Sequence, residues 1–164
     1  MHHYPDFPIL IVDDEPGICF SMSSVLKSAG ISNVVECQKS GSAIDMIRRS
    51  GAMIILLDLI MPEKNGEDIL VTIKDEFPDV IVIIITGKDD LLTAVNCMRN
   101  GAFDYITKPV DEELLIPSLR RAVKMQELRI ENENLTRQIL EKPLGDPSAF
   151  SSIISGSDKI RSLF

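Results

Sequence analysis

The sequence is poor in aromatic residues, in cysteine and in net positive charge. These shortages limit the kinds of site and of binding partner that the protein can have. Aromatic residues make up 5% of the 164 residues, and tryptophan is absent. The three cysteines, Cys19, Cys37 and Cys97, lie far apart and match no metal-binding or redox spacing, so we expect reduced and mostly buried thiols. No apolar run reaches the roughly 18–20 residues of a membrane helix, and the start MHHYPDFP does not resemble a signal peptide. We therefore expect a cytoplasmic protein without a membrane partner.

The charge distribution argues against direct nucleic-acid binding by this chain. The net charge is −8: residues 1–110 carry 16 acidic and 9 basic side chains, a net −7, and residues 111–164 carry 9 and 8, a net −1. Neither part offers the basic surface that pairs with phosphates. Hydrophobic residues amount to 45% of the chain, which is enough for a folded core.

Short apolar segments with the character of strands recur along the chain. They span 9–12, 33–37, 53–58, 80–85 and 103–107. The first, third and fourth are apolar throughout, which is typical of strands buried on both faces of a parallel sheet. Segments with helical spacing lie between them. This alternation predicts an α/β fold, a doubly wound five-stranded parallel sheet of the flavodoxin-like kind.

Helix signals mark the intervening segments. A first helix is expected to start at Pro16 and to stop near Gly30, because proline favours a first turn and glycine a helix end. Apolar residues at helical spacing predict three more helices at 41–50, 66–77 and 89–100.

The last element differs from the others in length. One helical pattern runs from Asp111 to about Lys142 without a glycine, and its proline, Pro117, lies near the start, where it is tolerated. We therefore expect a domain over 1–125, an extended helix over 126–142, and over 143–164 a linker with the start of a missing output domain.

Polar side chains follow the predicted strands at their carboxyl ends. Asp13 and Asp14 follow the first strand, Asp58 the third, Thr86 the fourth and Lys108 the fifth. In a doubly wound sheet these ends share one rim, where sites form. Three carboxylates facing one ammonium suit a divalent cation. Because the ligands are all hard oxygens, we expect Mg²⁺, with Mn²⁺ possible.

The same residues suit phosphoryl chemistry. Asp58 can act as a nucleophile on phosphorus and form an acyl phosphate. Lys108 and the cation can neutralise the charge on the transferring group, and Thr86 can donate a hydrogen bond to it.

Four motifs resemble the receiver domain of two-component response regulators over roughly residues 7–125. They are VDDE (12–15), LLDLIMPEKNG (56–66), IIITG (83–87) and FDYITKP (103–109). The resemblance implies that Asp58 accepts a phosphoryl group from a histidine kinase. It also implies that Mg²⁺ is held by Asp13, Asp14, Asp58 and the backbone carbonyl of Ile60, that Thr86 and Tyr105 form a switch pair, and that Lys108 assists. In the family, the peptide bond before Pro109 is often cis.

The end of the chain carries a second, looser resemblance. The long helix and the stretch SSIISGSDKI are similar to the receivers of sigma-54-dependent transcriptional activators. The sequence contains no G-x-x-x-x-G-K-[ST] motif, so this chain cannot hydrolyse nucleotide by that route. The resemblance implies the regulatory part of such an activator.

One further property, the lifetime of the phosphoryl group, is interpreted from single positions. Ile60 and Lys88 lie two residues after Asp58 and Thr86, where the family tunes acyl-phosphate hydrolysis. Because Ile60 is apolar and cannot orient water, we expect a long-lived phosphoryl group.

The long helix offers a dimer seam. One heptad choice places Met125, Asn132 and Ile139 at position a, and Leu128 and Leu135 at position d. A homodimer through this helix, or through the face of the fourth helix, fifth strand and fifth helix, competes with a solvated helix that docks on a missing domain.

Two other classes of function remain as alternatives. One is an aspartyl-phosphate phosphatase, although such enzymes show D-x-D and this chain has Asp58-Leu59-Ile60. The other is a pseudo-receiver that binds partners without phosphorylation. The preferred interpretation is a signalling switch that modifies only itself and is not an enzyme acting on other substrates.

Overall fold

The computed structural model describes residues 2–141, and its core is a five-stranded parallel sheet. The strands are β1 (Ile9–Val12), β2 (Val34–Cys37), β3 (Ile54–Leu57), β4 (Ile81–Thr86) and β5 (Asp104–Thr107). Their order is β2-β1-β3-β4-β5, and every neighbouring pair is parallel. The predicted doubly wound fold is confirmed. The linker and output-domain start expected over 143–164 lie outside the described residues.

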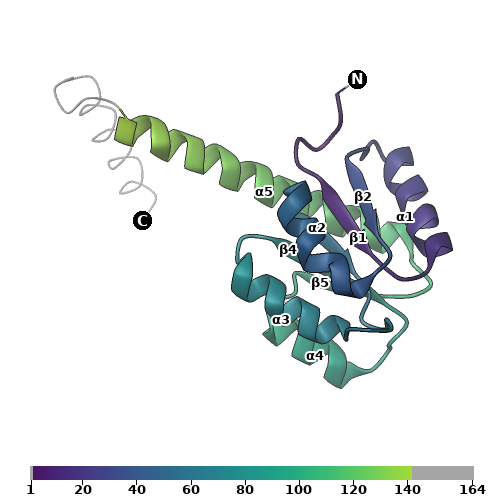
Figure 1. The fold of residues 1–164 in the computed structure, drawn as a ribbon. Helices are drawn as coiled ribbons and strands as arrows, with labels where there is room; N and C mark the ends of the chain where they lie inside the picture. Colours follow the sequence, from purple (N-terminus) through teal and green to yellow (C-terminus); the bar gives the residue numbers. More distant parts are fainter. Residues whose placement is uncertain (1, 142–164) are drawn as a thin grey trace, which may run out of the picture. The chain divides into compact units, whose positions relative to one another are not determined.

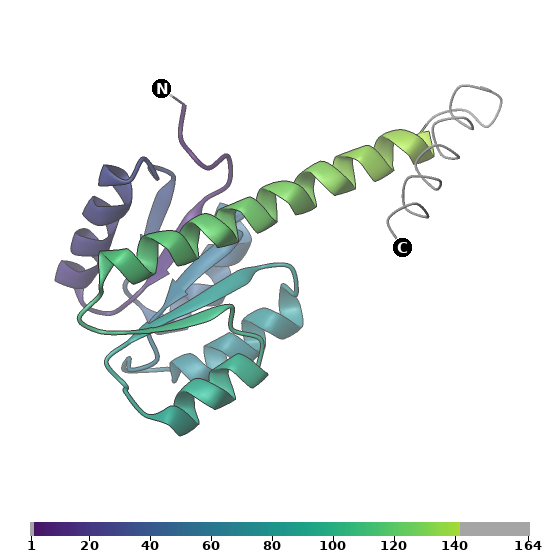
Figure 2. The same ribbon diagram turned by 180° about the vertical axis from the view of Figure 1, so that it is seen from behind.

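Helices connect the strands and cover both faces of the sheet. They are α1 (Pro16–Ser28), the 3₁₀ turn η1 (Ser40–Ser42), α2 (Ala43–Ser50), α3 (Gly66–Glu76), α4 (Leu91–Arg99) and α5 (Glu112–Glu141). The helix α1 and the first turns of α5 cover one face, and α2, α3 and α4 cover the other (Figures 1 and 2). This arrangement buries the central strands between two helical layers.

The burial of the strands explains their sequence pattern. All residues of β1, β3 and β4 are buried, whereas β2 and β5 at the edges are only partly buried. The central strands therefore need apolar side chains on both faces. Val12 is in register with Leu57 on one side and Cys37 on the other. The residues that follow Val12 and Leu57 consequently lie side by side at the carboxyl rim.

The helix α4 shows an apolar stripe that faces solvent. It begins at Leu91, two residues later than predicted, because the Asp90 carboxylate accepts a hydrogen bond from the Thr93 amide at 2.7 Å and caps the helix. Its buried residues are Thr93 and Cys97. The large apolar side chains that indicated this helix are exposed instead: Leu91, Leu92, Val95 and Met98.

The chain divides into two compact units, Met1–Lys124 and Met125 onward, and α5 contributes to both. Pro117 lies inside α5. Beyond Lys124, four of the apolar side chains of the predicted dimer seam are about half exposed: Met125, Leu128, Leu135 and Ile139. No helix in residues 2–141 is long and apolar enough to cross a membrane.

Candidate phosphoacceptor site

The register of the sheet brings Asp13 and Asp58 together. The Asp13 amide donates to the Cys37 carbonyl at 3.1 Å, and the Asp58 amide donates to the Val12 carbonyl at 2.9 Å, so both residues extend the strand pairing. Both are buried. Asp14 is partly exposed, and each of the three carboxylates offers an oxygen within 4.8 Å of the others. The rim therefore concentrates negative charge in a small volume.

Lys108 supplies the cation that faces this cluster. Its Nζ lies 2.7 Å from Oδ2 of Asp13 and 3.2 Å from Oδ2 of Asp58. The Lys108 amide donates to the Thr86 carbonyl at 2.8 Å, which fixes the start of the side chain beside β4. Burial lowers the pKa of Lys108, but the hydrogen bond and charge of Asp13 and the charge of Asp58 outweigh it, so the pKa lies above its ordinary value. Lys108 is therefore charged at neutral pH.

The donor set fits a hard divalent cation. Three carboxylates carry three negative charges, and Lys108 neutralises one of them. The oxygens near one another belong to Asp13, Asp14 and Asp58, with no histidine or cysteine in the group. Such oxygen sites with few protein ligands favour Mg²⁺. The Ile60 amide donates to Oδ1 of Asp58 at 3.2 Å, while the metal-ligand role of the Ile60 carbonyl stays a prediction.

The predicted switch residues are joined through Lys88. Thr86 is buried, and its Oγ1 accepts a hydrogen bond from the Lys88 amide at 3.3 Å. The Tyr105 hydroxyl donates to the Lys88 carbonyl. Lys88 Nζ pairs with Oε1 of Glu67, in the first turn of α3, at 3.3 Å. The sequence did not indicate Glu67, because an acidic residue in a first helical turn is ordinary.

The titration of Tyr105 tests its partly buried position. Burial, then the nearby acidic groups Cys97, Asp90 and Glu67, raises the pKa of Tyr105 to about 12. In a Tyr4→Phe chain, where Tyr105 is the remaining tyrosine, we expect an ultraviolet titration with a midpoint about two units above the usual ~10. Because the folded chain holds this proton more tightly, stability should fall as pH rises from about 10 to about 12. A midpoint near 10 with native circular dichroism contradicts the prediction, and the chain in denaturant supplies the reference.

The three cysteines are reduced thiols and buried, as predicted. Cys19 lies close to the site, since its Sγ donates to the Asp13 carbonyl at 3.3 Å. Burial, with the charge of Asp13 adding to it, raises the pKa of Cys19 to about 11. Cys19 therefore stays protonated and supports the end of β1 as a packed side chain.

The loop after Asp58 packs tightly at both of its ends. The Gly66 amide donates to the Leu59 carbonyl at 3.1 Å, and the Asn65 side chain caps α3 by accepting from the Glu67 amide at 3.0 Å. A Cβ on Gly66 would lie 2.4 Å from the Asp58 carbonyl oxygen. The loop has a second support in Ser40, which hydrogen-bonds the loop from the β2–α2 connection and which the sequence did not indicate.

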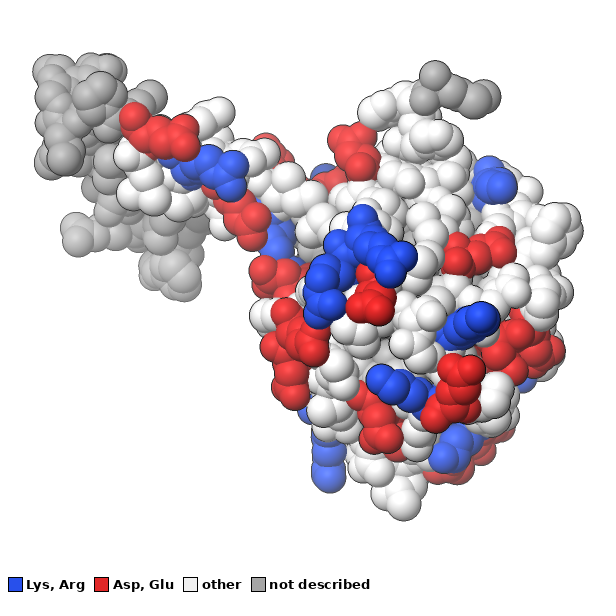
Figure 3. Space-filling view, viewed as in Figure 1, with Lys and Arg blue, Asp and Glu red and all other residues white. Residues whose placement is uncertain are grey.

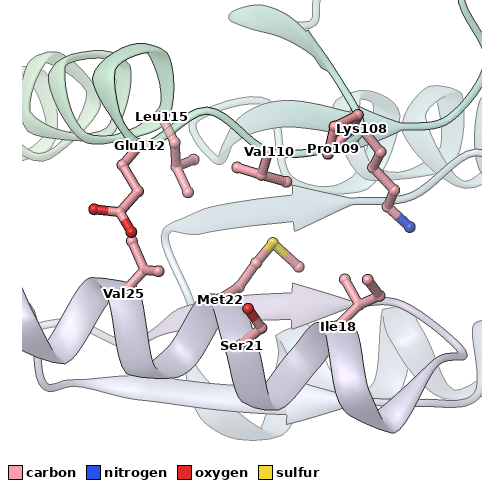
Figure 4. Close-up of a pocket in the computed structure, with 9 residues that line it drawn as sticks. All are labelled: Ile18, Ser21, Met22, Val25, Lys108, Pro109, Val110, Glu112 and Leu115. Atoms are coloured by element: carbon pink, nitrogen blue, oxygen red, sulfur yellow. The ribbon is translucent and has the colours of Figure 1, made fainter.

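A groove opens beside Lys108, between α1 and the connection from β5 to α5 (Figure 4). Its volume is about 280 Å³. The lining is mostly apolar and consists of Ile18, Ser21, Met22, Val25, Lys108, Pro109, Val110, Glu112 and Leu115. The Lys108–Pro109 peptide bond at its edge is cis, as the motif implied. The groove therefore places an apolar surface next to the acidic rim.

Charged side chains of both signs are mixed on the visible face of the first unit. On the face of Figure 3, lysine and arginine side chains lie among aspartate and glutamate side chains. Two such contacts involve Arg48, which pairs with Asp45 at 3.3 Å and Glu76 at 3.0 Å.

Comparison with known proteins agrees with this geometry. Residues 9–120 match the response regulator receiver domain family. A response regulator described as NtrX-like from Rickettsia bellii is 35% identical over 136 residues, which cover 82% of this chain and 28% of that protein. The C4-dicarboxylate transport transcriptional regulatory protein DctD of Pseudomonas aeruginosa is 30% identical over 135 residues, 82% of this chain and 29% of that protein.

A solved structure shows the same fold. The signal receiver domain of a LuxO repressor protein from Vibrio parahaemolyticus superposes with a TM-score of 0.72 at 28% identity, covering 77% of this chain and 96% of that one. The chain therefore belongs to the response regulator receiver domain family. It spans less than a third of the length of the NtrX-like and DctD proteins that it matches.

Proposed function

We propose that this receiver works as a phosphorylation switch with Asp58 as its phosphoacceptor. The observation that carries the proposal is the placement of Lys108 Nζ between the carboxylates of Asp13 and Asp58, at 2.7 and 3.2 Å. The ammonium holds Asp58 in place and offers positive charge where a phosphoryl oxygen arrives. Mg²⁺ bound by Asp13, Asp14, Asp58 and the Ile60 carbonyl would supply further positive charge to the phosphoryl oxygens.

In the transfer step, a carboxylate oxygen of Asp58 forms a bond to phosphorus while the bond between phosphorus and the donor breaks. With phosphohistidine as donor, the imidazole nitrogen leaves and takes up a proton. Hydrolysis of the acyl phosphate then returns the Asp58 carboxylate and releases inorganic phosphate. The exposed apolar side chain of Ile60 offers no group to orient the attacking water, which supports a long-lived phosphoryl group.

Thr86 and Tyr105 transmit the conformational change that follows phosphorylation of Asp58. When the Thr86 hydroxyl turns to a phosphoryl oxygen, it gives up the Lys88 amide, and Lys88 also holds the Tyr105 hydroxyl through its carbonyl. A shift of the β4–α4 connection therefore reaches Tyr105 and the exposed apolar stripe of α4. This coupling supports the proposed switch pair.

The proposed donor is a sensor histidine kinase, the partner of response regulator receivers. The groove between α1 and the β5–α5 connection supports this proposal, because it offers an apolar surface that borders Lys108, whose ammonium contacts Asp58. The absent output domain is proposed to be a sigma-54-type transcriptional activator. The similarity to DctD, a transcriptional regulatory protein much longer than this chain, supports that proposal.

Acetyl phosphate tests the site directly. With Mg²⁺ and acetyl phosphate, intact mass spectrometry should find one phosphoryl group on the chain and none on Asp58→Asn, since Asp58 provides the attacking oxygen. Asp75→Asn, which removes an exposed carboxylate of α3, is the matched control and should be phosphorylated normally. Phosphorylation of Asp58→Asn to the same extent contradicts the assignment.

Sedimentation of the same samples, or of samples with beryllofluoride, examines the proposed homodimer. The half-exposed seam of α5 and the exposed stripe of α4 are the two surfaces that support it. A change in the sedimenting mass that Asp58→Asn abolishes shows that phosphorylation controls assembly. The direction of that change shows whether the dimer forms or separates.

A further inference from the structure

The hydroxyl of Ser40 joins the β2–α2 connection to the loop that follows Asp58. Its Oγ donates to the Pro62 carbonyl at 2.6 Å and accepts from the Lys64 amide at 3.1 Å. Ser40 is buried, with 3% of its surface exposed. A single side chain, 22 and 24 residues distant from its partners, therefore uses both its donor and its acceptor on one loop.

The centre of that loop depends on Ser40 for its hydrogen bonds to other elements. The start is held where the Ile60 amide donates to Asp58, and the end is held where the Gly66 amide donates to Leu59. Among the described residues, the hydrogen bonds that connect 61–64 to another element all end on Ser40. Ser40 therefore fixes the part of the loop that its two ends leave open.

The backbone in this stretch needs such support. Glu63 has a φ of +72°, in the left-handed region that a residue with a side chain rarely adopts. Residues in this region persist when their surroundings hold them there. The 3₁₀ turn also packs closely on the loop, since a Cβ on Gly41 would lie 3.0 Å from Oε2 of Glu63.

We propose that Ser40 is a positioning residue for the phosphorylation of Asp58. By holding Pro62 and Lys64, its hydroxyl keeps the backbone at Ile60 in the shape that receives the metal ion beside Asp58. This inference rests on the proposed function. Ser40 acts through the loop and touches neither the metal ion nor the phosphoryl group.

Ser40→Ala should weaken Mg²⁺ binding, because the centre of the loop loses both hydrogen bonds that connect it to another element and keeps only the internal bond from the Lys64 amide to the Pro62 carbonyl. Loss of a residue that orients metal ligands typically lowers metal affinity by about tenfold or more, and we expect roughly tenfold here. The rate of phosphorylation by acetyl phosphate should fall at low Mg²⁺ and approach that of the unchanged chain at saturating Mg²⁺. A loss of stability that leaves the chain fully folded, as urea unfolding would show, does not produce this dependence on Mg²⁺.

Ser23→Ala provides the matched control. Ser23 is also buried, and its Oγ donates at 2.7 Å to Oε1 of Glu36, which joins α1 to β2 at a distance from the loop. The experiment compares Mg²⁺ titrations of the unchanged chain, Ser40→Ala and Ser23→Ala, followed by amide NMR without a phosphodonor, and then their acetyl phosphate rates. Urea unfolding reports the stability of each chain.

The expected result is a weaker Mg²⁺ midpoint for Ser40→Ala and an unchanged midpoint for Ser23→Ala. Equal midpoints in the three chains overturn the inference, while phosphorylation of the unchanged chain still supports the proposed function. An unchanged chain that accepts no phosphoryl group overturns the proposed function and, with it, the inference. If Ser40→Ala does not fold, Ser40→Cys decides by the same titration, because the thiol keeps the size but hydrogen-bonds weakly.

Discussion

Lys108→Met is expected to slow phosphoryl transfer to Asp58 by on the order of a hundredfold or more. Removing one preorganised group that stabilises developing charge typically costs a factor of that size. Lys108 Nζ is such a group, since it lies 3.2 Å from Oδ2 of Asp58 and is held there by Asp13 at 2.7 Å. Methionine keeps an unbranched, flexible side chain of nearly the same length and removes the charge. The measurement is the initial rate with acetyl phosphate at saturating Mg²⁺, followed by intact mass.

The same substitution should also lower the free energy of unfolding, by about 3 kcal/mol at neutral pH. It leaves the buried carboxylates of Asp13 and Asp58 without their ammonium partner. Because the pKa of Lys108 is raised in the folded chain, its contribution is present at neutral pH and is lost only as pH rises beyond 10.5 and through the raised pKa. Added Mg²⁺ should restore part of the loss, since the same carboxylates would bind it.

Lys88→Met is the control for the stability effect. Its ammonium pairs with Glu67 at 3.3 Å, but the side chain is 44% exposed, so the pair is screened by solvent. Exposed pairs contribute at most about 1 kcal/mol. Urea unfolding of the two variants at low ionic strength makes the comparison. Equal losses in the two chains would show that the buried position of Lys108 carries no special stabilisation.

Gly66→Ala is expected to be among the most destabilising single substitutions in the chain. An added Cβ would lie 2.4 Å from the Asp58 carbonyl oxygen and 2.5 Å from the Leu59 Cα. Both contacts are with backbone, which cannot turn away as a side chain can. Overpacking typically costs up to about 3 kcal/mol, and we expect a loss at that upper end. The loop would have to shift at Asp58, so phosphorylation should slow as well.

Gly17→Ala is the matched control, because Gly17 also lies in the first turn of a helix. A Cβ there meets no atom within 4 Å. Alanine favours the helix over glycine, so α1 should be unchanged or more stable by up to about 1 kcal/mol. Chemical denaturation of both variants supplies the measurement. A Gly66→Ala chain as stable as the unchanged protein would show that the loop adapts without cost.

The strand assignments could be made from the sequence because they depend on local patterns. Buried central strands require continuous apolar residues, and Ile9–Val12 and Ile54–Leu57 show this pattern directly. The residues at the carboxyl rim could be predicted in the same way, because all strands of a parallel sheet end at the same edge. The proximity of Asp13, Asp58 and Lys108 could therefore be predicted from the sequence alone.

Contacts between segments that are distant in the sequence could be identified only from the tertiary structure. Ser40 lies in an ordinary polar connection, and the sequence does not show that it holds the loop after Asp58. Glu67 lies in an ordinary first helical turn, and the sequence does not show that it pairs with Lys88. The stripe of α4 indicated a helix but not that its apolar side chains face solvent.

What the sequence by itself determined is the order of the strands and helices along the chain, the parallel sheet and the set of residues at its rim. Only the tertiary structure decided which rim groups touch, such as Lys108 with Asp13, 95 residues apart. The physical reason is that periodicity and turn chemistry act between sequence neighbours. Side-chain contacts across the fold depend instead on strand register, loop shape and packing, which become defined only when the whole sheet assembles.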